Sequence, residues 1–322
     1  MMTFFYVVFL IIGLAVFLIG MRILCKSLKE LNSSKFKKQI RNATKNKYRG
    51  VLIGATLTAI AQSSSAVTVA LVSFANSGLC NLREIVGVLM GANIGTTASA
   101  WIVCLSNANF NTKIPAIVII SAILFLLFFL LVMIKQQLAN IFLGLAMLLL
   151  GIFLMSNMMY PFKDYFIQSR IISYCINPII GILVGTILTA ILQSSSVTIG
   201  ILQALSVTGA VPFSVAIPII AGANIGSCVT ALISSIGTNK NAQATGLMHL
   251  YFNTIGSFII LALFYGVNIW CQFSFLAMPV NMLTLTIIHT AFNVISTIIL
   301  LPFSGGLVLL SQKSVNKIKL FK

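Results

Sequence analysis

Apolar and polar positions of this chain alternate on the scale of whole helices rather than of single turns. Apolar runs long enough to cross a bilayer are separated by short connectors that carry most of the charged residues. With 59% hydrophobic residues, 7% charged residues and a mean hydropathy of +1.08, the pattern predicts an all-α integral membrane protein and excludes an ordinary soluble domain. The runs cover residues 4–20, 51–75, 83–105, 116–134, 139–160, 178–205, 213–236, 246–270 and 282–301.

Two of these runs are interrupted near their middle by a polar tetrad. At a rise of 1.5 Å per residue, each flanking apolar piece is only about 16 Å long, which is half a bilayer. A spanning helix and a re-entrant hairpin with the tetrad at its tip both fit such a run. A hairpin tip implies a cavity, because non-helical backbone at that depth needs protein or water around it. The tetrads are Gln62, Ser63, Ser64 and Ser65 in run 51–75, and Gln193, Ser194, Ser195 and Ser196 in run 178–205.

The two tetrads lie 131 positions apart, and the same offset joins many other residues. It relates Gly13 to Gly144, and Gly91-Ala-Asn93-Ile-Gly95 to Gly222-Ala-Asn224-Ile-Gly226. A register of this kind predicts an internal duplication. We expect a first repeat over residues 1–138, a second over 139–270, and a segment 271–322 that adds one further transmembrane helix and a basic tail. Three spans and one hairpin per unit is an odd number of crossings, so the second repeat is expected to be inverted.

The basic residues report orientation in the membrane. Ten of the twenty lie between Arg22 and Arg49, and four more lie in the tail from Lys313 to Lys322. By the positive-inside rule both segments are expected on the cytoplasmic side of the plasma membrane, which leaves the amino terminus outside. The net charge of +17 therefore does not require a nucleic-acid partner. Loop charge alone does not separate hairpins from full spans, but the strongly basic connector before the first tetrad has no equally basic counterpart in the second unit, which favours hairpins.

The tetrads offer hydroxyl, amide and helix-end groups that suit small ions. Helix amino termini favour an anion, and carbonyl and hydroxyl oxygens suit a hard cation such as sodium. The three acids, Glu30, Glu84 and Asp164, lie in or beside connectors, so a cation would be held by neutral oxygens. Close packing of small residues explains a single serine cluster equally well. Two tetrads in register, each followed 31 positions later by Asn-Ile-Gly, favour a binding site. The glycines of both Gly-Ala-Asn-Ile-Gly segments are expected to loosen the helix and free carbonyls for a ligand.

These paired segments resemble the type II family of sodium–phosphate cotransporters, including its bacterial members, from Gly13 to about Pro302. The resemblance implies two inverted repeats, two re-entrant hairpins, phosphate near the tips and sodium nearby. It departs from the family at Ser227-Cys228, where a threonine run is usual, and in ending without the PhoU-like cytoplasmic domain of many bacterial members. Carried over by motif, the candidate binding residues are both tetrads with Asn93, Thr96, Thr97, Asn224, Ser227 and, more weakly, Thr230.

The resulting hypothesis is a sodium-driven phosphate importer, with no organic cofactor and no metal besides sodium. The alternatives are the same machine carrying another small anion such as sulfate, or working as an exporter. The lack of core acids favours an electroneutral cycle of two sodium ions with divalent phosphate.

An intramembrane serine hydrolase needs one activated serine beside His249 or His289, and no Gly-x-Ser-x-Gly elbow is present. A purely structural membrane protein leaves the matched polar tips unexplained. Each histidine is followed four residues later by an asparagine, which predicts a local contact or, alternatively, proton coupling.

Overall fold

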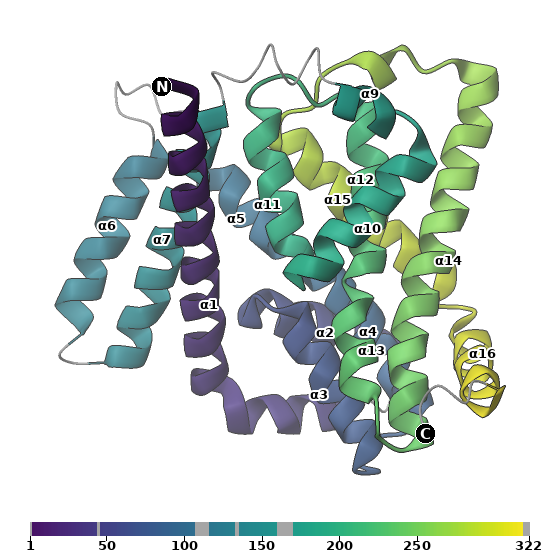
Figure 1. The fold of residues 1–322 in the computed structure, drawn as a ribbon. Helices are drawn as coiled ribbons and strands as arrows, with labels where there is room; N and C mark the ends of the chain where they lie inside the picture. Colours follow the sequence, from purple (N-terminus) through teal and green to yellow (C-terminus); the bar gives the residue numbers. More distant parts are fainter. Residues whose placement is uncertain (1, 44–45, 107–115, 133–134, 160–169, 318–322) are drawn as a thin grey trace.

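The computed structural model describes residues 2–43, 46–106, 116–132, 135–159 and 170–317, and within them all regular structure is helical (Figure 1). The connector acid Asp164 lies outside the described residues. The elements are α1 (Met2–Ala43), α2 (Lys47–Ala61), α3 (Ser64–Asn76), α4 (Leu82–Gly95), α5 (Thr97–Ser106), α6 (Ala116–Leu131), α7 (Gln136–Met159), α9 (Arg170–Cys175), α10 (Pro178–Leu192), α11 (Ser195–Ser206), α12 (Phe213–Gly226), α13 (Cys228–Ser235), α14 (Lys240–Cys271), η2 (Ser274–Ala277), α15 (Met282–Leu300) and α16 (Ser304–Lys317).

The described helices confirm the prediction of an all-helical membrane protein. Six segments are long and apolar enough to cross a bilayer. They contain no more than two charged residues within an apolar window, as hydrocarbon requires. These segments are Phe5–Leu24, Leu82–Leu105, Gln136–Met158, Phe213–Ser235, Lys240–Cys271 and Met282–Leu300.

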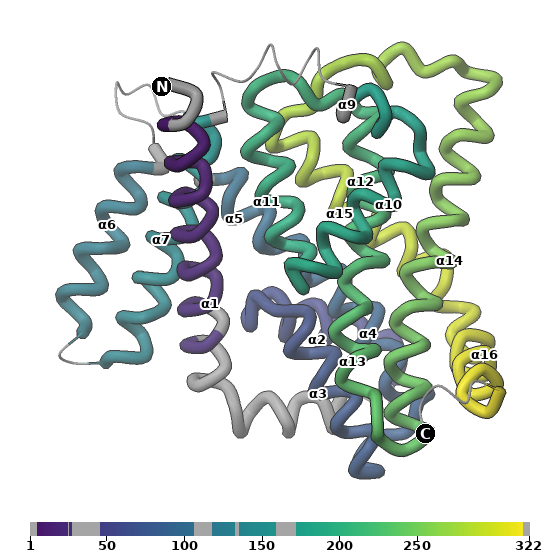
Figure 2. Tube along the Cα trace, in the orientation of Figure 1, coloured from purple at the N-terminus to yellow at the C-terminus, as the bar shows by residue number. Residues whose placement is uncertain are grey.

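Each tetrad-containing run forms two short helices joined by a tight break. Helices α2 and α3 have 15 and 13 residues, and α10 and α11 have 15 and 12, so at 1.5 Å per residue none exceeds about 23 Å. Each break consists of a glutamine with positive φ, 49° at Gln62 and 54° at Gln193, followed by a serine that caps the second helix. The α2–α3 pair occupies the lower half of the bundle and the α10–α11 pair the upper half (Figures 1 and 2).

Glycines bring α2 against α4 at backbone distance. A Cβ atom on Gly91 would lie 2.0 Å from the carbonyl oxygen of Val51, and one on Gly54 would lie 2.1 Å from that of Val88. Helices α10 and α12 repeat these contacts at an offset of 131, with Gly222 against Ile182. Gly91 stays inside a continuous helix. The expectation that it loosens the helix is therefore wrong, because its missing side chain serves close packing instead.

Helices α1 and α7 pack through a second set of glycines and run in opposite directions (Figure 1). Gly20 of α1 contacts the backbone of Leu148, and Gly151 of α7 contacts that of Phe17. At the offset of 131, Gly20 corresponds to Gly151 and Phe17 to Leu148. The two contacts are therefore equivalent, because exchanging the two helices turns one contact into the other.

Helices from the two halves of the chain also interleave. Helix α3 packs against α13 and α14, whereas α11 packs against α5 and α15. Helix α15 thus stands beside α5 and α11 as α14 stands beside α13 and α3. The sequence register does not show this correspondence, because α14 and α15 follow one another in the chain.

Substitution of Gly91 by alanine is expected to destabilise the protein by about 1–3 kcal/mol, because the new methyl group meets backbone that cannot move independently. Thermal unfolding of the purified protein in detergent measures this. Gly266 of α14, whose Cβ position has no atom within 4 Å, is the matched control. Gly266→Ala should leave stability unchanged or raise it by up to about 1 kcal/mol through helix propensity. Equal stability of Gly91→Ala and Gly266→Ala would contradict the close packing of α2 on α4.

Candidate functional site

The breaks in the two helix pairs, which form their tips, contact one another. The hydroxyl of Ser65 donates a hydrogen bond to the carbonyl oxygen of Gln193 at 3.3 Å. The hydroxyl of Ser196 lies 3.0 Å from that of Ser99, near the start of α5. The predicted tetrads are therefore brought together, although they are 131 positions apart in the chain.

Each tip presents the first turn of a helix. Ser63 is the N-cap of α3, where its Oγ accepts from the Ala66 N–H at 3.2 Å, and Ser194 caps α11 in the same way from the Val197 N–H at 3.4 Å. The N–H groups of Ser64 and Ser65, the first two residues of α3, have no carbonyl partner within their own helix. The same holds for Ser195 and Ser196 in α11. Two helix amino termini with free N–H groups and hydroxyls therefore lie at neighbouring tips, which suits an anion.

The glutamines end the first helix of each hairpin. The Nε2 of Gln62 donates to the carbonyl oxygen of Ala59 at 2.5 Å, which holds the side chain against its own helix. Gln62 is buried, with 8% of its surface exposed, whereas Gln193 is exposed. The two tips are therefore similar in backbone but differ in how much of the amide they present.

The α4–α5 junction lies one helical turn from the first tip. A Cβ on Gly95 would lie 2.7 Å from Cβ of Thr58, which precedes Gln62 by four residues. The predicted loosening is confined to Thr96, between α4 and α5, and the hydroxyl of Thr96 donates back to the carbonyl of Ala92 at 2.9 Å. Thr97 donates to the carbonyl of Ile94 at 2.8 Å. The carbonyls expected to be free are thus partly occupied by the threonines themselves.

The α12–α13 junction lies equally close to the second tip. Its Gly226 faces Thr189, which precedes Gln193 by four residues. Ser227 donates to the carbonyl of Asn224 at 2.7 Å, and Thr230 to that of Ser227 at 3.1 Å. At Cys228, where the first unit has Thr97, the sulfur accepts from Nδ2 of Asn253 at 3.2 Å. The departure from the threonine run therefore replaces a hydroxyl by a thiol that α14 already engages.

Several buried polar atoms at these junctions have no hydrogen-bond partner among the described residues. They include the Nδ2 atoms of Asn93 and Asn224, which are 4% and 3% exposed, and Oγ1 of Thr58, which is 1% exposed. In the second unit the matching Thr189 hydroxyl lies 2.7 Å from that of Thr198. Burying an unpaired polar group costs about 1–3 kcal/mol, so these atoms point to groups that a ligand or water would satisfy.

Ser99, Thr58 and Thr189 were not among the candidate residues predicted from the sequence. Ser99 corresponds to the named candidate Thr230 at the offset of 131, so the duplication itself contained that signal. Thr58 and Thr189 also match one another, and each precedes its tetrad glutamine by four residues. Contacts across the bundle were needed to connect them with the junctions.

The two histidines are buried, at 2% and 0% exposure, and neither imidazole has a hydrogen-bond partner among the described residues. The predicted local contacts are confirmed, since Asn253 donates to the carbonyl of His249 at 3.2 Å and Asn293 to that of His289 at 2.8 Å. In both cases the bond uses the histidine backbone. Neither histidine is paired with a serine, as a hydrolase would require.

Comparison with known proteins finds relatives that are named for phosphate transport. YqeW of Bacillus subtilis, an uncharacterized protein, is 30% identical over 76% of this chain and 78% of its own length. YjbB of Escherichia coli K12, provisionally named an inorganic phosphate export protein, is 27% identical over 78% of this chain but only 45% of its own length. Rat sodium-dependent phosphate transport protein 2A is 35% identical over 31% of this chain and 16% of its own length. No solved structure is significantly similar to the chain.

The family model described as Na+/Pi-cotransporter matches residues 16–157 and 162–287. The matches include both tetrads, both Asn-Ile-Gly segments and the His249 helix. Because they extend over most of the sequence, they do not depend on one short motif. The chain therefore belongs to the Na+/Pi-cotransporter family.

Proposed function

We propose that this protein is a secondary active symporter that couples sodium entry to the transport of inorganic phosphate. The observation that carries the proposal is the contact of the two duplicated tips, Ser65 with Gln193, beside the second contact of Ser196 with Ser99. Hydroxyl and carbonyl groups from both halves of the chain then lie together at the tips, within reach of one small ion. Phosphate transport is what the family shares, and sodium dependence is what the names of the mammalian relatives state.

In this proposal the two halves are inverted repeats, and each short hairpin enters the membrane without crossing it. The reciprocal contacts of Gly20 and Gly151 support inversion, because equivalent helices that run antiparallel meet in this way about a two-fold axis. The repeats are 1–138 and 139–270, with α15 and α16 in the remaining segment 271–322. The membrane is the plasma membrane, with the basic segments on the cytoplasmic side.

Phosphate is proposed to bind at the tips, where the first-turn N–H groups of α3 and α11 and the serine hydroxyls donate to its oxygens. Sodium is proposed to bind beside it, at the junctions of the broken helices. The first junction offers an unpaired hydroxyl at Thr58, whereas the second offers a Thr189 hydroxyl already paired with Thr198 and a thiol at Cys228. A hard cation prefers oxygen to sulfur, so the first junction is the stronger cation site.

Export by the same machine is the second candidate function, and the name of the Escherichia coli relative favours it. A coupled carrier moves in the direction of the net gradient. Import of a divalent anion against a potential of about 100 mV costs roughly 4.6 kcal/mol, which two sodium ions cancel. The direction in the cell therefore depends on the ion gradients and not on the fold.

Radiolabelled phosphate uptake into proteoliposomes with an inward sodium gradient tests the proposal. Uptake is expected with sodium and not with potassium, and Gln62→Ala and Gln193→Ala should each lower it at least tenfold, since each glutamine shapes one tip. Gln272→Ala is the matched control, because Gln272 has the same positive φ, 44°, but ends α14 away from the tips. Sodium-independent uptake would contradict the coupling. Loss of uptake in only one of the two tip variants would contradict the shared site.

The proposed cation site predicts that replacing the two matched threonines, Thr58 and Thr189, by valine affects different properties of the protein. Thr58→Val should leave stability unchanged or improve it, because it removes an unpaired hydroxyl, yet raise the sodium concentration for half-maximal uptake several-fold. Thr189→Val should cost about 1 kcal/mol of stability through loss of the Thr198 contact, with a smaller effect on sodium. Val67 stands at the position that corresponds to Thr198, so Val67→Thr would give the Thr58 hydroxyl a hydrogen-bond partner. This variant should likewise keep or improve stability and raise the sodium concentration for half-maximal uptake. An unchanged sodium dependence in Thr58→Val would remove this site.

Transport is expected to be electroneutral, because the described core contains no carboxylate to hold a further cation. Phosphate accumulation should then be the same with and without a potassium diffusion potential of about −100 mV. A cycle that moves one net charge would change accumulation by about 50-fold under that potential. A sodium-dependent inward current on phosphate addition would show that the cycle is electrogenic.

A further inference from the structure

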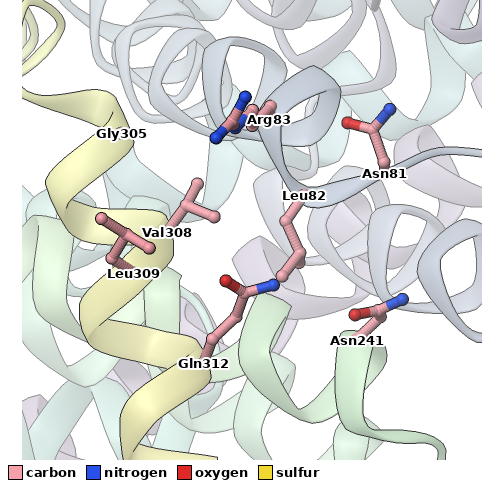
Figure 3. Close-up of a pocket in the computed structure, with 8 residues that line it drawn as sticks. All are labelled: Asn81, Leu82, Arg83, Asn241, Gly305, Val308, Leu309 and Gln312. Carbon is pink, nitrogen blue, oxygen red and sulfur yellow. The ribbon is translucent and has the colours of Figure 1, made fainter.

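A cavity of about 320 Å³ lies where α16 packs against the starts of α4 and α14 (Figure 3). None of the tip or junction residues lines it. Its polar side chains are Asn81, Arg83, Asn241 and Gln312, which come from three different elements of the fold. The cavity is therefore separate from the proposed transport site and is not used by any step of it.

The polar side of this cavity suits an anion with several oxygens. Arg83 is the charged residue among those that line it, and none of the described lining residues is acidic. The carboxamides of Asn241 and Gln312 add donors from α14 and α16. The first turn of α14 also lies at the cavity and contains no acidic residue, so its helix dipole adds to the positive potential. In α4 the dipole is offset by Glu84, whose carboxylate accepts from the Asn81 N–H at 2.9 Å. A guanidinium with surrounding amide donors is the usual protein environment of a phosphate group.

The other side of the cavity is apolar and continues onto an exposed surface. Val308 is buried in the wall, while Leu309, also in the wall, is 55% exposed and its neighbour Leu310 is 41% exposed. Inorganic phosphate makes no favourable contact with such an apolar surface, whereas the acyl chains of a lipid pack against it. We propose that the cavity binds the phosphate-containing headgroup of an anionic phospholipid whose acyl chains lie along α16.

A lipid in this position links α16 to the helices that form the transport site. Helix α16 is already tied to α14, since Tyr251 Oη donates to Ser314 Oγ at 2.7 Å and Lys240 Nζ donates to Asn316 Oδ1 at 3.1 Å. Its contact with α4 is less extensive, and the cavity lies at that contact. The headgroup supplies the missing connection between Arg83 at the start of α4 and Gln312 of α16. This site does not depend on the proposed function, because it forms whether or not the protein transports phosphate.

Lipid binding to the purified full chain tests the proposal. Native mass spectrometry and thermal unfolding in detergent are measured during titration with phosphatidylglycerol, phosphatidylcholine or inorganic phosphate. Phosphatidylglycerol should bind and raise the unfolding temperature, and Arg83→Gln should weaken that binding about tenfold, because a charge-assisted hydrogen bond is lost. Gln312→Ala should weaken it less. Lys313→Gln, which removes a neighbouring exposed charge of α16 outside the cavity, should bind like the unaltered protein.

Three outcomes would overturn the lipid assignment. Unchanged phosphatidylglycerol binding in both Arg83→Gln and Gln312→Ala would remove the cavity as the site. An equal loss in Lys313→Gln and Arg83→Gln would show that the lipid responds only to the general positive charge. A stabilisation by inorganic phosphate that Arg83→Gln abolishes would assign the cavity to free phosphate. Phosphate bound at the hairpin tips does not confuse this test, because Arg83→Gln leaves the tips unaltered.

Discussion

The structure depends on one constraint, which is that polar groups at a helix end inside an apolar bundle need partners from the protein or its ligands. Each hairpin ends in such a place, with a capping serine and unpaired first-turn N–H groups. Where the two helix pairs meet, Ser65 donates to the carbonyl of Gln193, so each tip gives the other a polar partner. The duplication thus supplies both sides of this contact.

The glycine contacts determine where the tips lie relative to the broken helices. Because α2 touches α4 at the backbone, Gly95 falls beside Thr58, one turn from the tip. Helices α10 and α12 repeat the arrangement with Gly226 and Thr189. A side chain at the Gly91 or Gly222 contact would separate the pair and move the junction away from the tip. The glycines thus position the site without contributing any chemistry to it.

The sequence predicted those features whose cause is local. A Gln-Ser-Ser-Ser tetrad between two short apolar pieces marked the position of both helix breaks, and the repeat identified their equivalence. The sequence did not show the position of α15 beside α5, because this arrangement depends on how the halves interleave and not on their order in the chain. It also assigned Gly91 to flexibility, since a glycine needed for a close contact and one needed for a bend look alike in a single sequence. Ser99 was recoverable through its match with Thr230, but its contact with Ser196 was not.

The differences between the halves limit what the symmetry can mean for transport. Thr198 satisfies Thr189, but Val67 stands at the matching place and leaves the Thr58 hydroxyl unpaired at a cost of about 1–3 kcal/mol. Cys228 likewise replaces Thr97 and is engaged by Asn253. If the two halves held equivalent cation sites, we would expect the two matched threonine hydroxyls to have the same hydrogen-bond partners. In the proposed symporter, a cation that binds the Thr58 hydroxyl offsets this cost in the first half. Because Thr58 lies where α2 packs against α4, cation binding and the packing of the first hairpin are energetically coupled.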